Sequence, residues 1–167
     1  WYATLLAIKG RNDEAKAEMR LALDLNPTSP NFLADLGQIY YFNREFAEAE
    51  KYCRKALEIY PDFVFARAYL FQIYLKTGEY DRAVEEILAG EKSVSTFPNE
   101  SAVRQKEILD ALEIQRKIFR EGGIRGFIEN RSIGIQNEDS CYHFAQNYSF
   151  LGDVDKALTC LEKAQAG

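Results

Sequence analysis

The sequence predicts an all-α fold, an α-solenoid built from antiparallel helix hairpins. The main observation is a recurrence at 34 residues: Pro27 and Pro61 close the similar phrases Ala-Leu-Asp-Leu-Asn-Pro and Ala-Leu-Glu-Ile-Tyr-Pro. A second observation is that only 4 prolines and 10 glycines interrupt 167 residues, which favours long regular elements. A repeat of this length is typical of hairpin units that stack on their neighbours.

Sliding the chain by 34 residues aligns further columns, and a shift of 74 from the third unit finds another copy near the end. We expect a small column to let paired helices approach closely, a large column to fill the space between units, and a turn column to take the left-handed conformation. These columns are Ala15, Ala49, Ala83 and Ala157; Tyr40, Tyr74 and Tyr148; and Gly10, Gly78 and Gly152, with Arg44 in the turn column of the second unit.

Apolar periodicity and turn residues predict the helices in order. The first three hairpins consist of helices 1–9 and 12–25, 30–42 and 45–59, and 63–76 and 79–92. A loop over 93–99 precedes a long helix, 100–121, which Gly122 and Gly123 end, and a short helix follows at 124–131. We interpret this stretch as a degenerate hairpin, because Ile128 occupies its small column. After a polar loop at 132–138, helices 139–151 and 153–166 form the last hairpin.

Polar residues at the predicted helix starts are candidate N-caps. Ser29 precedes Pro30, which suits the first helical turn. The other candidates are Asn12, Asp62, Asp153, and either Asp139 or Ser140.

The 34-residue period with these small, aromatic and proline columns resembles the tetratricopeptide repeat (TPR) over residues 1–93 and 138–167. The resemblance implies hairpins that wind into a right-handed superhelix. It also implies one array over 1–167, with hairpins at about 1–27, 29–61, 62–93, a degenerate 100–131, and 138–167.

Several blocks are similar to a narrower group, the C-terminal TPR region of bacterial winged-helix transcriptional regulators. They are Trp1-Tyr2-Ala3, residues 19–30, residues 36–42, Glu121-Gly122-Gly123-Ile124-Arg125-Gly126-Phe127, and residues 151–157. This likeness implies the sensor or effector half of a cytoplasmic regulator. Alternatives are the C-terminal array of a serine/threonine protein kinase, a dimerisation scaffold, or a periplasmic domain of a membrane-anchored regulator. Because the chain begins with Trp1, we expect it to be part of a longer protein.

Composition argues against several other classes of function. The net charge is −5 with a pI near 5.1, and the Lys and Arg residues are scattered along the sequence. The sequence therefore lacks the basic stripe that is typical of a nucleic-acid-binding protein. No apolar run approaches the ~18 residues that span a bilayer. Cys53, Cys141 and Cys160 form no metal-binding spacing, and no catalytic motif is present. We therefore expect a non-catalytic protein without cofactor or metal. The resemblance to the TPR implies that its partner is a protein or peptide.

The first helix of each hairpin is expected to line a concave groove. By spacing, the first unit contributes Trp1, Thr4 and Ile8. The other candidate groove residues are Asn31, Asp35, Gln38, Tyr41 and Phe42; Phe65, Tyr69, Gln72 and Lys76; and Tyr142, His143, Gln146 and Phe150. Such rings and amides can contact an extended peptide. The alternative is that several of these side chains pack against neighbouring units.

Two further expectations concern charge and self-association. Glu85 and Glu86 are predicted to lie on a solvated helix face, and Glu50 is spaced to pair with Arg54. Apolar residues of the terminal repeats, among them Leu158 and Leu161, are candidate surfaces for a homodimer.

Overall fold

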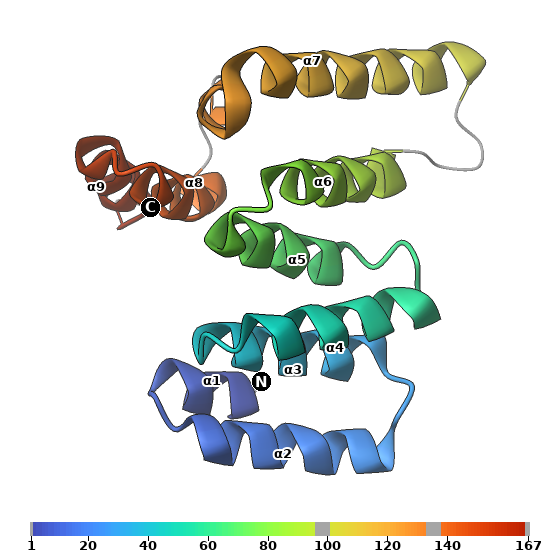
Figure 1. Cartoon of the computed structure of the whole chain (residues 1–167), viewed down its shortest axis with the longest axis vertical. Coiled ribbons are helices and arrows are strands. Elements are labelled where there is room, and N and C mark those ends of the chain that lie inside the picture. The colour runs from blue at the N-terminus through green and yellow to red at the C-terminus, as the bar shows by residue number, and fades with distance from the viewer. Residues whose placement is uncertain (1, 96–100, 133–137, 166–167) are drawn as a thin grey trace. The chain divides into compact units, whose positions relative to one another are not determined.

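The computed structural model describes residues 2–95, 101–132 and 138–165, and the side chains of most of them. Helices account for nearly all of the described residues, and no strand is present among these residues. The helices are α1 (Tyr2–Ile8), α2 (Asn12–Leu25), α3 (Pro30–Phe42), α4 (Phe46–Ile59), α5 (Val64–Thr77), α6 (Tyr80–Ser95), α7 (Ala102–Ser132), α8 (Glu138–Phe150) and α9 (Val154–Gln165) (Figure 1). Within these ranges, no helix combines the length and the apolar character that crossing a bilayer requires.

The chain divides into two compact units, Trp1–Leu112 and Glu113–Gly167. In the first unit, the hairpins α1/α2, α3/α4 and α5/α6 follow one another as a stack (Figure 1). Each second helix contacts the first helix of the next hairpin, and the first helices α1, α3 and α5 also contact one another in sequence. The second unit contains the later part of α7 and the hairpin α8/α9. A single continuous array over 1–167 remains a prediction.

The small column lies where the two helices of a hairpin meet. Ala15, Ala49 and Ala83 are 0% exposed, as predicted. In the second hairpin the fit is tight on both helices: a Cβ added to Gly37 would lie 2.6 Å from Cys53 Sγ and 3.0 Å from the carbonyl oxygen of Ala49. The backbones of α3 and α4 therefore approach at a point that has no room for another methyl group.

The turn column has the left-handed conformation that the sequence predicts. Gly10, Gly78 and Gly152 have φ angles of 77°, 81° and 76°. Arg44, which occupies this column in the second hairpin, also has a positive φ of 60°. The hairpin geometry thus imposes the conformation even on a residue with a Cβ, for which it is strained.

The predicted break at Gly122 and Gly123 is also present. Gly123 has φ 60° and ψ −164°, so α7 consists of two helical segments joined at a kink. Within the second unit these segments fold back on each other, because Phe119 contacts Phe127 edge to face at 6.2 Å and Gln115 donates to Asn130 at 3.1 Å. Ile128, which replaces the small residue expected there, is buried.

Two of the predicted helix caps are confirmed. The Ser29 hydroxyl accepts a hydrogen bond from the backbone N–H of Phe32 at 3.3 Å, ahead of Pro30 at the first turn of α3. Asp153 accepts from the backbone N–H of Lys156 at 3.2 Å at the start of α9.

Two other predicted caps are wrong. The Asn12 side chain donates to Asn43 Oδ1 at 2.7 Å, and the N-cap position of α2 belongs to Arg11. Asp62 accepts from the Ser93 hydroxyl at 2.7 Å, so it links the two ends of the third hairpin instead of capping α5. In both cases the side chain forms a hydrogen bond with a polar residue that is distant in sequence. The side chains of Asp139 and Ser140 lie outside the described residues.

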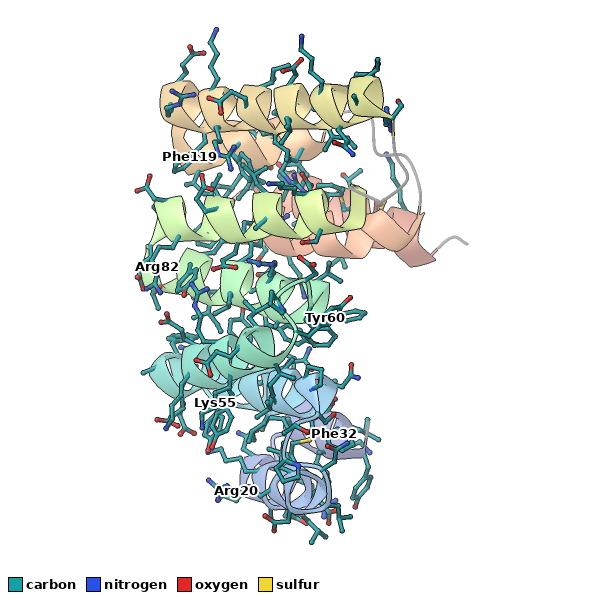
Figure 2. The ribbon with its side chains drawn as sticks, turned by 90° about the vertical axis from the view of Figure 1, so that its right-hand side faces the viewer. Arg20, Phe32, Lys55, Tyr60, Arg82 and Phe119 are labelled. Atoms are coloured by element: carbon teal, nitrogen blue, oxygen red, sulfur yellow. The ribbon has the colours of Figure 1, made fainter. Side chains whose placement is uncertain are left out.

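The large column joins successive hairpins through arginine. Arg20 on α2 donates to the Tyr40 hydroxyl at 3.0 Å, and Arg54 on α4 donates to the Tyr74 hydroxyl at 2.9 Å, one period later. Arg20, Lys55 and Arg82 project along one edge of the first unit, and Phe32 and Tyr60 lie on its other side (Figure 2). This repeated tyrosine–arginine contact helps to fix the register between hairpins.

Glu86 corrects one prediction, because it is 7% exposed and not solvated. Its carboxylate pairs with Arg54 of the preceding hairpin at 2.5 Å and with Arg67 of its own hairpin at 2.8 Å. Glu86 occupies the column of Tyr52, whose ring stacks on Tyr40 at 5.3 Å in the second hairpin. The ion pairs thus replace a ring stack at the same place in the repeat. The Glu50–Arg54 pair is present at 4.0 Å, as its spacing predicts.

The close approach at Gly37 predicts opposite effects for two buried helical glycines. Gly37→Ala should lower the free energy of unfolding by about 1–3 kcal/mol, because the new methyl group overlaps Cys53 and the α4 backbone. Gly90→Ala should raise it by up to about 1 kcal/mol, because its Cβ would meet Arg67 at an ordinary 3.7 Å while alanine favours the helix. Urea denaturation measures both variants. Equal effects of the two substitutions would contradict the packing described for α3 and α4.

Candidate functional site

The outward residues of α3 form one stripe along the helix. Asn31, Asp35, Gln38 and Phe42 follow the spacing i, i+4, i+7 and i+11, which places them on a single face. They are exposed or half-buried, whereas Leu36 and most of the other apolar residues of α3 are buried. The stripe is therefore the side of α3 that the hairpin packing leaves open.

The same stripe recurs one period later on α5, at Phe65, Tyr69, Gln72 and Lys76, and Thr4 and Ile8 occupy its columns on α1. Because α3 contacts both α1 and α5, the columns of the three helices lie side by side. We call this surface the A-helix face. It consists of Thr4, Ile8, Asn31, Asp35, Gln38, Phe42, Phe65, Tyr69, Gln72 and Lys76.

Rows across the A-helix face have distinct chemistry. Thr4, Gln38 and Gln72 form a hydrogen-bonding row whose side chains offer donors and acceptors. Asp35 and Tyr69 form a row that is half-buried. Phe65 is 60% exposed and Phe42 is 42% exposed, so rings are available at both edges of the face.

Asp35 and Tyr69 affect each other electrostatically. Burial raises the pKa of the Asp35 carboxyl above its usual value. Burial, and secondly the charge of Asp35, raise the pKa of Tyr69 to about 12. Among the described residues, no lysine or arginine side chain compensates the carboxylate of Asp35.

Tyr41, a predicted groove residue, lies beside the stripe and not on it. Its ring is tilted against Phe46 of α4 with centroids 5.9 Å apart, and against Phe42 at 5.8 Å. Burial raises the pKa of its hydroxyl. Tyr41 therefore contributes to packing within the second hairpin, as the alternative interpretation of the groove residues expects for some of them.

The remaining predicted groove residues belong to the second unit. Gln146 and Phe150 lie on α8, where Gln146 is exposed and Phe150 is half-buried. The side chains of Trp1, Tyr142 and His143 lie outside the described residues. The structure describes α8 and the A-helix face in separate units.

An aromatic cluster at the junction of α4 and α5 is not anticipated by the repeat columns. Phe63 is nearly buried, and its ring lies 6.1 Å from that of Tyr60 and 5.6 Å from that of Phe65. Tyr60 is 52% exposed, so the cluster extends the ring surface beyond the A-helix face. The aromatic residues around Pro61 were the available signal in the sequence.

The cysteines have the environment of packing residues. Cys53 and Cys141 are buried, and Cys160 is partly exposed. Burial raises the pKa of the Cys53 thiol to about 12, which disfavours the nucleophilic thiolate at neutral pH. Within the described part of the chain, no group of three or more His, Cys, Asp or Glu side chains is arranged to hold a metal ion.

Stacked antiparallel helix hairpins with a recurring small column define the class of α-solenoid repeat proteins. Tetratricopeptide repeat models match residues 30–63, residues 52–85, and the two stretches 1–29 and 138–166. Together these matches cover more than half of the chain. The stretches 1–29, 30–63 and 138–166 span the hairpins α1/α2, α3/α4 and α8/α9, and 52–85 runs from α4 through α5 to the start of α6. The chain belongs to the tetratricopeptide repeat family and is a protein–protein interaction module.

Known proteins are similar to the chain at low identity. The anaphase-promoting complex subunit CDC16 of Saccharomyces cerevisiae is 33% identical over 72 residues, a stretch that makes up 43% of this chain and only 9% of the yeast protein. The crystal structure of MamA has a TM-score of 0.53 at 16% identity, covering 96% of this chain and 91% of that one.

A putative kinesin light chain of Podosopora anserina, with nearly identical TPR-like repeats, has a TM-score of 0.51 at 17% identity. The similarity covers 99% of this chain and 90% of that one. At these identities the two solved structures show the fold alone, and they confirm the predicted class, an all-α array of TPR hairpins.

The raised pKa of Asp35 predicts a pH-dependent stability. Between the unfolded pKa and the higher folded pKa, the folded state holds more protons, so stability falls as pH rises through that window. Asp35→Asn removes this loss, and it should therefore be more stable than the parent chain at pH 7 and similar to it at pH 3. Urea midpoints across this pH range measure the difference.

The control for this comparison is Asp24→Asn, which changes an exposed carboxylate on α2. At pH 7 its free energy of unfolding should stay within about 0.5 kcal/mol of that of the parent chain, as is usual for exposed positions. A parent chain that gains stability over Asp35→Asn as pH rises would contradict the desolvation of Asp35.

Proposed function

We propose that the A-helix face binds an extended peptide segment of a partner protein. The observation that carries this proposal is the contact of α1 with α3 and of α3 with α5. It places exposed and half-buried side chains of the same repeat columns in rows across the three helices. Aromatic and amide side chains on this face can contact a ligand, whereas the alanines of the small column are buried between the helices of each hairpin.

The dimensions of an extended peptide suit such rows. Packed helices lie about 8–10 Å apart, and an extended chain advances about 3.3 Å per residue, so about three peptide residues pass from one helix to the next. A segment of about six residues would reach from α1 to α5. Its backbone presents donors and acceptors in alternation, which Gln38 and Gln72 can each satisfy with one side chain.

The biological setting is a further part of the proposal. The blocks that resemble the C-terminal region of bacterial winged-helix regulators support a sensor or effector role, in which peptide binding would be transmitted to an attached domain. A C-terminal array of a serine/threonine protein kinase is the alternative that the same resemblance allows.

Peptide binding can be tested with a random 12-residue phage library selected against the chain, followed by affinity measurement on the peptides obtained. Gln38→Ala combined with Gln72→Ala should weaken binding by about tenfold or more, because two hydrogen-bonding side chains are removed together. The double variant should keep the melting temperature of the parent chain, since both side chains lie on the open face.

The matched control is Asp24→Ala combined with Glu58→Ala, which removes two exposed side chains from the second helices α2 and α4. This variant should bind the selected peptides as the parent does. Peptides that bind the glutamine variant unchanged, or that lose binding equally in both variants, would refute the A-helix face as the site.

A second candidate function, a dimerisation scaffold, is favoured by a different observation. Val154, Leu158 and Leu161 form an i, i+4, i+7 stripe on α9 and are 62%, 53% and 38% exposed. An exposed apolar stripe of this kind is a candidate for self-association.

Sedimentation tests the scaffold. A dimer of the chain should become monomeric with Leu158→Lys, whereas Lys156→Glu on the same helix should leave it intact. A parent chain that sediments as a monomer would contradict this second candidate.

A further inference from the structure

The carboxylates of the first unit differ in whether the chain supplies them with a cation. Glu86 pairs with two arginines, Glu45 pairs with Lys16, and Glu50 pairs with Arg82. Asp35 is half-buried on the A-helix face, and among the described residues no lysine or arginine side chain pairs with it. The positive charge of the amino terminus offsets only part of the effect of burial on the pKa of Asp35. Desolvating a carboxylate that has no ion-pair partner is unfavourable, so such groups are concentrated at functional sites.

The chain itself shows how a carboxylate and a tyrosine ring hold a guanidinium group. Arg82 lies over the ring of Tyr74, with its guanidinium carbon 4.1 Å from the centroid, while it pairs with Glu50. Arg54 approaches the same ring at 5.8 Å while it pairs with Glu86. In each case one arginine satisfies the carboxylate and contacts the ring face.

Asp35 and Tyr69 provide the same two components without the arginine. They occupy one column on the contacting helices α3 and α5, and the charge of Asp35 acts on the Tyr69 hydroxyl. The neighbouring row, Gln38 and Gln72, would hold the peptide backbone beside them. The net charge of −5 also favours the approach of a basic segment.

Resting on the proposed function of the A-helix face, we propose that Asp35 and Tyr69 anchor an arginine side chain of the bound peptide. The carboxylate accepts hydrogen bonds from the guanidinium group, and the ring contacts its planar face. The partner segment is therefore an extended peptide with an arginine near its centre, flanked by residues whose backbone contacts the glutamine row.

The test uses peptides selected by phage display on the full chain and retained only if Gln38→Ala with Gln72→Ala weakens their binding by about tenfold or more. These peptides should share an arginine. Replacing that arginine with citrulline, which has a similar shape and no charge, should weaken binding to the parent chain by about tenfold. The same replacement should change binding to Asp35→Asn by less than about twofold, because the charge pair is already absent.

Two variants complete the experiment. Asp35→Lys should reverse the preference, so that a peptide with glutamate in place of the arginine binds better than the parent peptide. Asp24→Lys, at an exposed position on α2, should leave the preference for arginine unchanged. Circular dichroism melting of each variant shows whether it is folded.

The outcomes separate this inference from the proposed function. Peptides that depend on the glutamine row but share no arginine, or whose citrulline forms lose equal affinity for the parent and for Asp35→Asn, overturn the anchor and leave the A-helix face as the site. Selection that yields no peptide dependent on the glutamine row overturns both proposals.

Discussion

The close approach of paired helices is the constraint on which the rest of the first unit depends. At Gly37 the α3 backbone lies against Ala49 and Cys53 of α4 with no space for a methyl group. Contact of this kind fixes which face of each helix points inward. Once that face is fixed, the helical period determines which residues remain on the open side. The A-helix face is thus a geometric consequence of the small columns.

The same constraint explains how charge is distributed over the repeats. Tyrosines of the large column reach across to the preceding hairpin, where arginines such as Arg54 satisfy their hydroxyls and the buried carboxylate of Glu86. In these contacts the charged side chains stabilise the packing of one hairpin on the next. On the A-helix face, Asp35 has no such partner among the described residues, so this part of the surface retains interaction capacity that packing does not consume.

Features that repeat with the backbone could be predicted from the sequence, and features that depend on long-range partners could not. Small residues and turn glycines identify hairpins through their spacing, and Gly10, Gly78 and Gly152 have the left-handed conformation expected of them. The Asn12 and Asp62 caps were wrong because more distant side chains compete for the same polar groups. Glu86 looked solvated because its two arginines become neighbours only after the hairpins stack. The open stripe was predictable from helical period, but the ring packing of Tyr41 was not.

The central claim is that the open rows of α1, α3 and α5 receive the partner, and nuclear magnetic resonance measures it directly. During titration with a selected arginine-containing peptide, the side-chain amide signals of Gln38 and Gln72 and the backbone amide of Tyr69 should shift together in a saturable manner. Signals of Asp24 and Glu58 on the second helices should remain in place. Saturable shifts confined to α2, α4 and α6, or to the second unit, would contradict the claim.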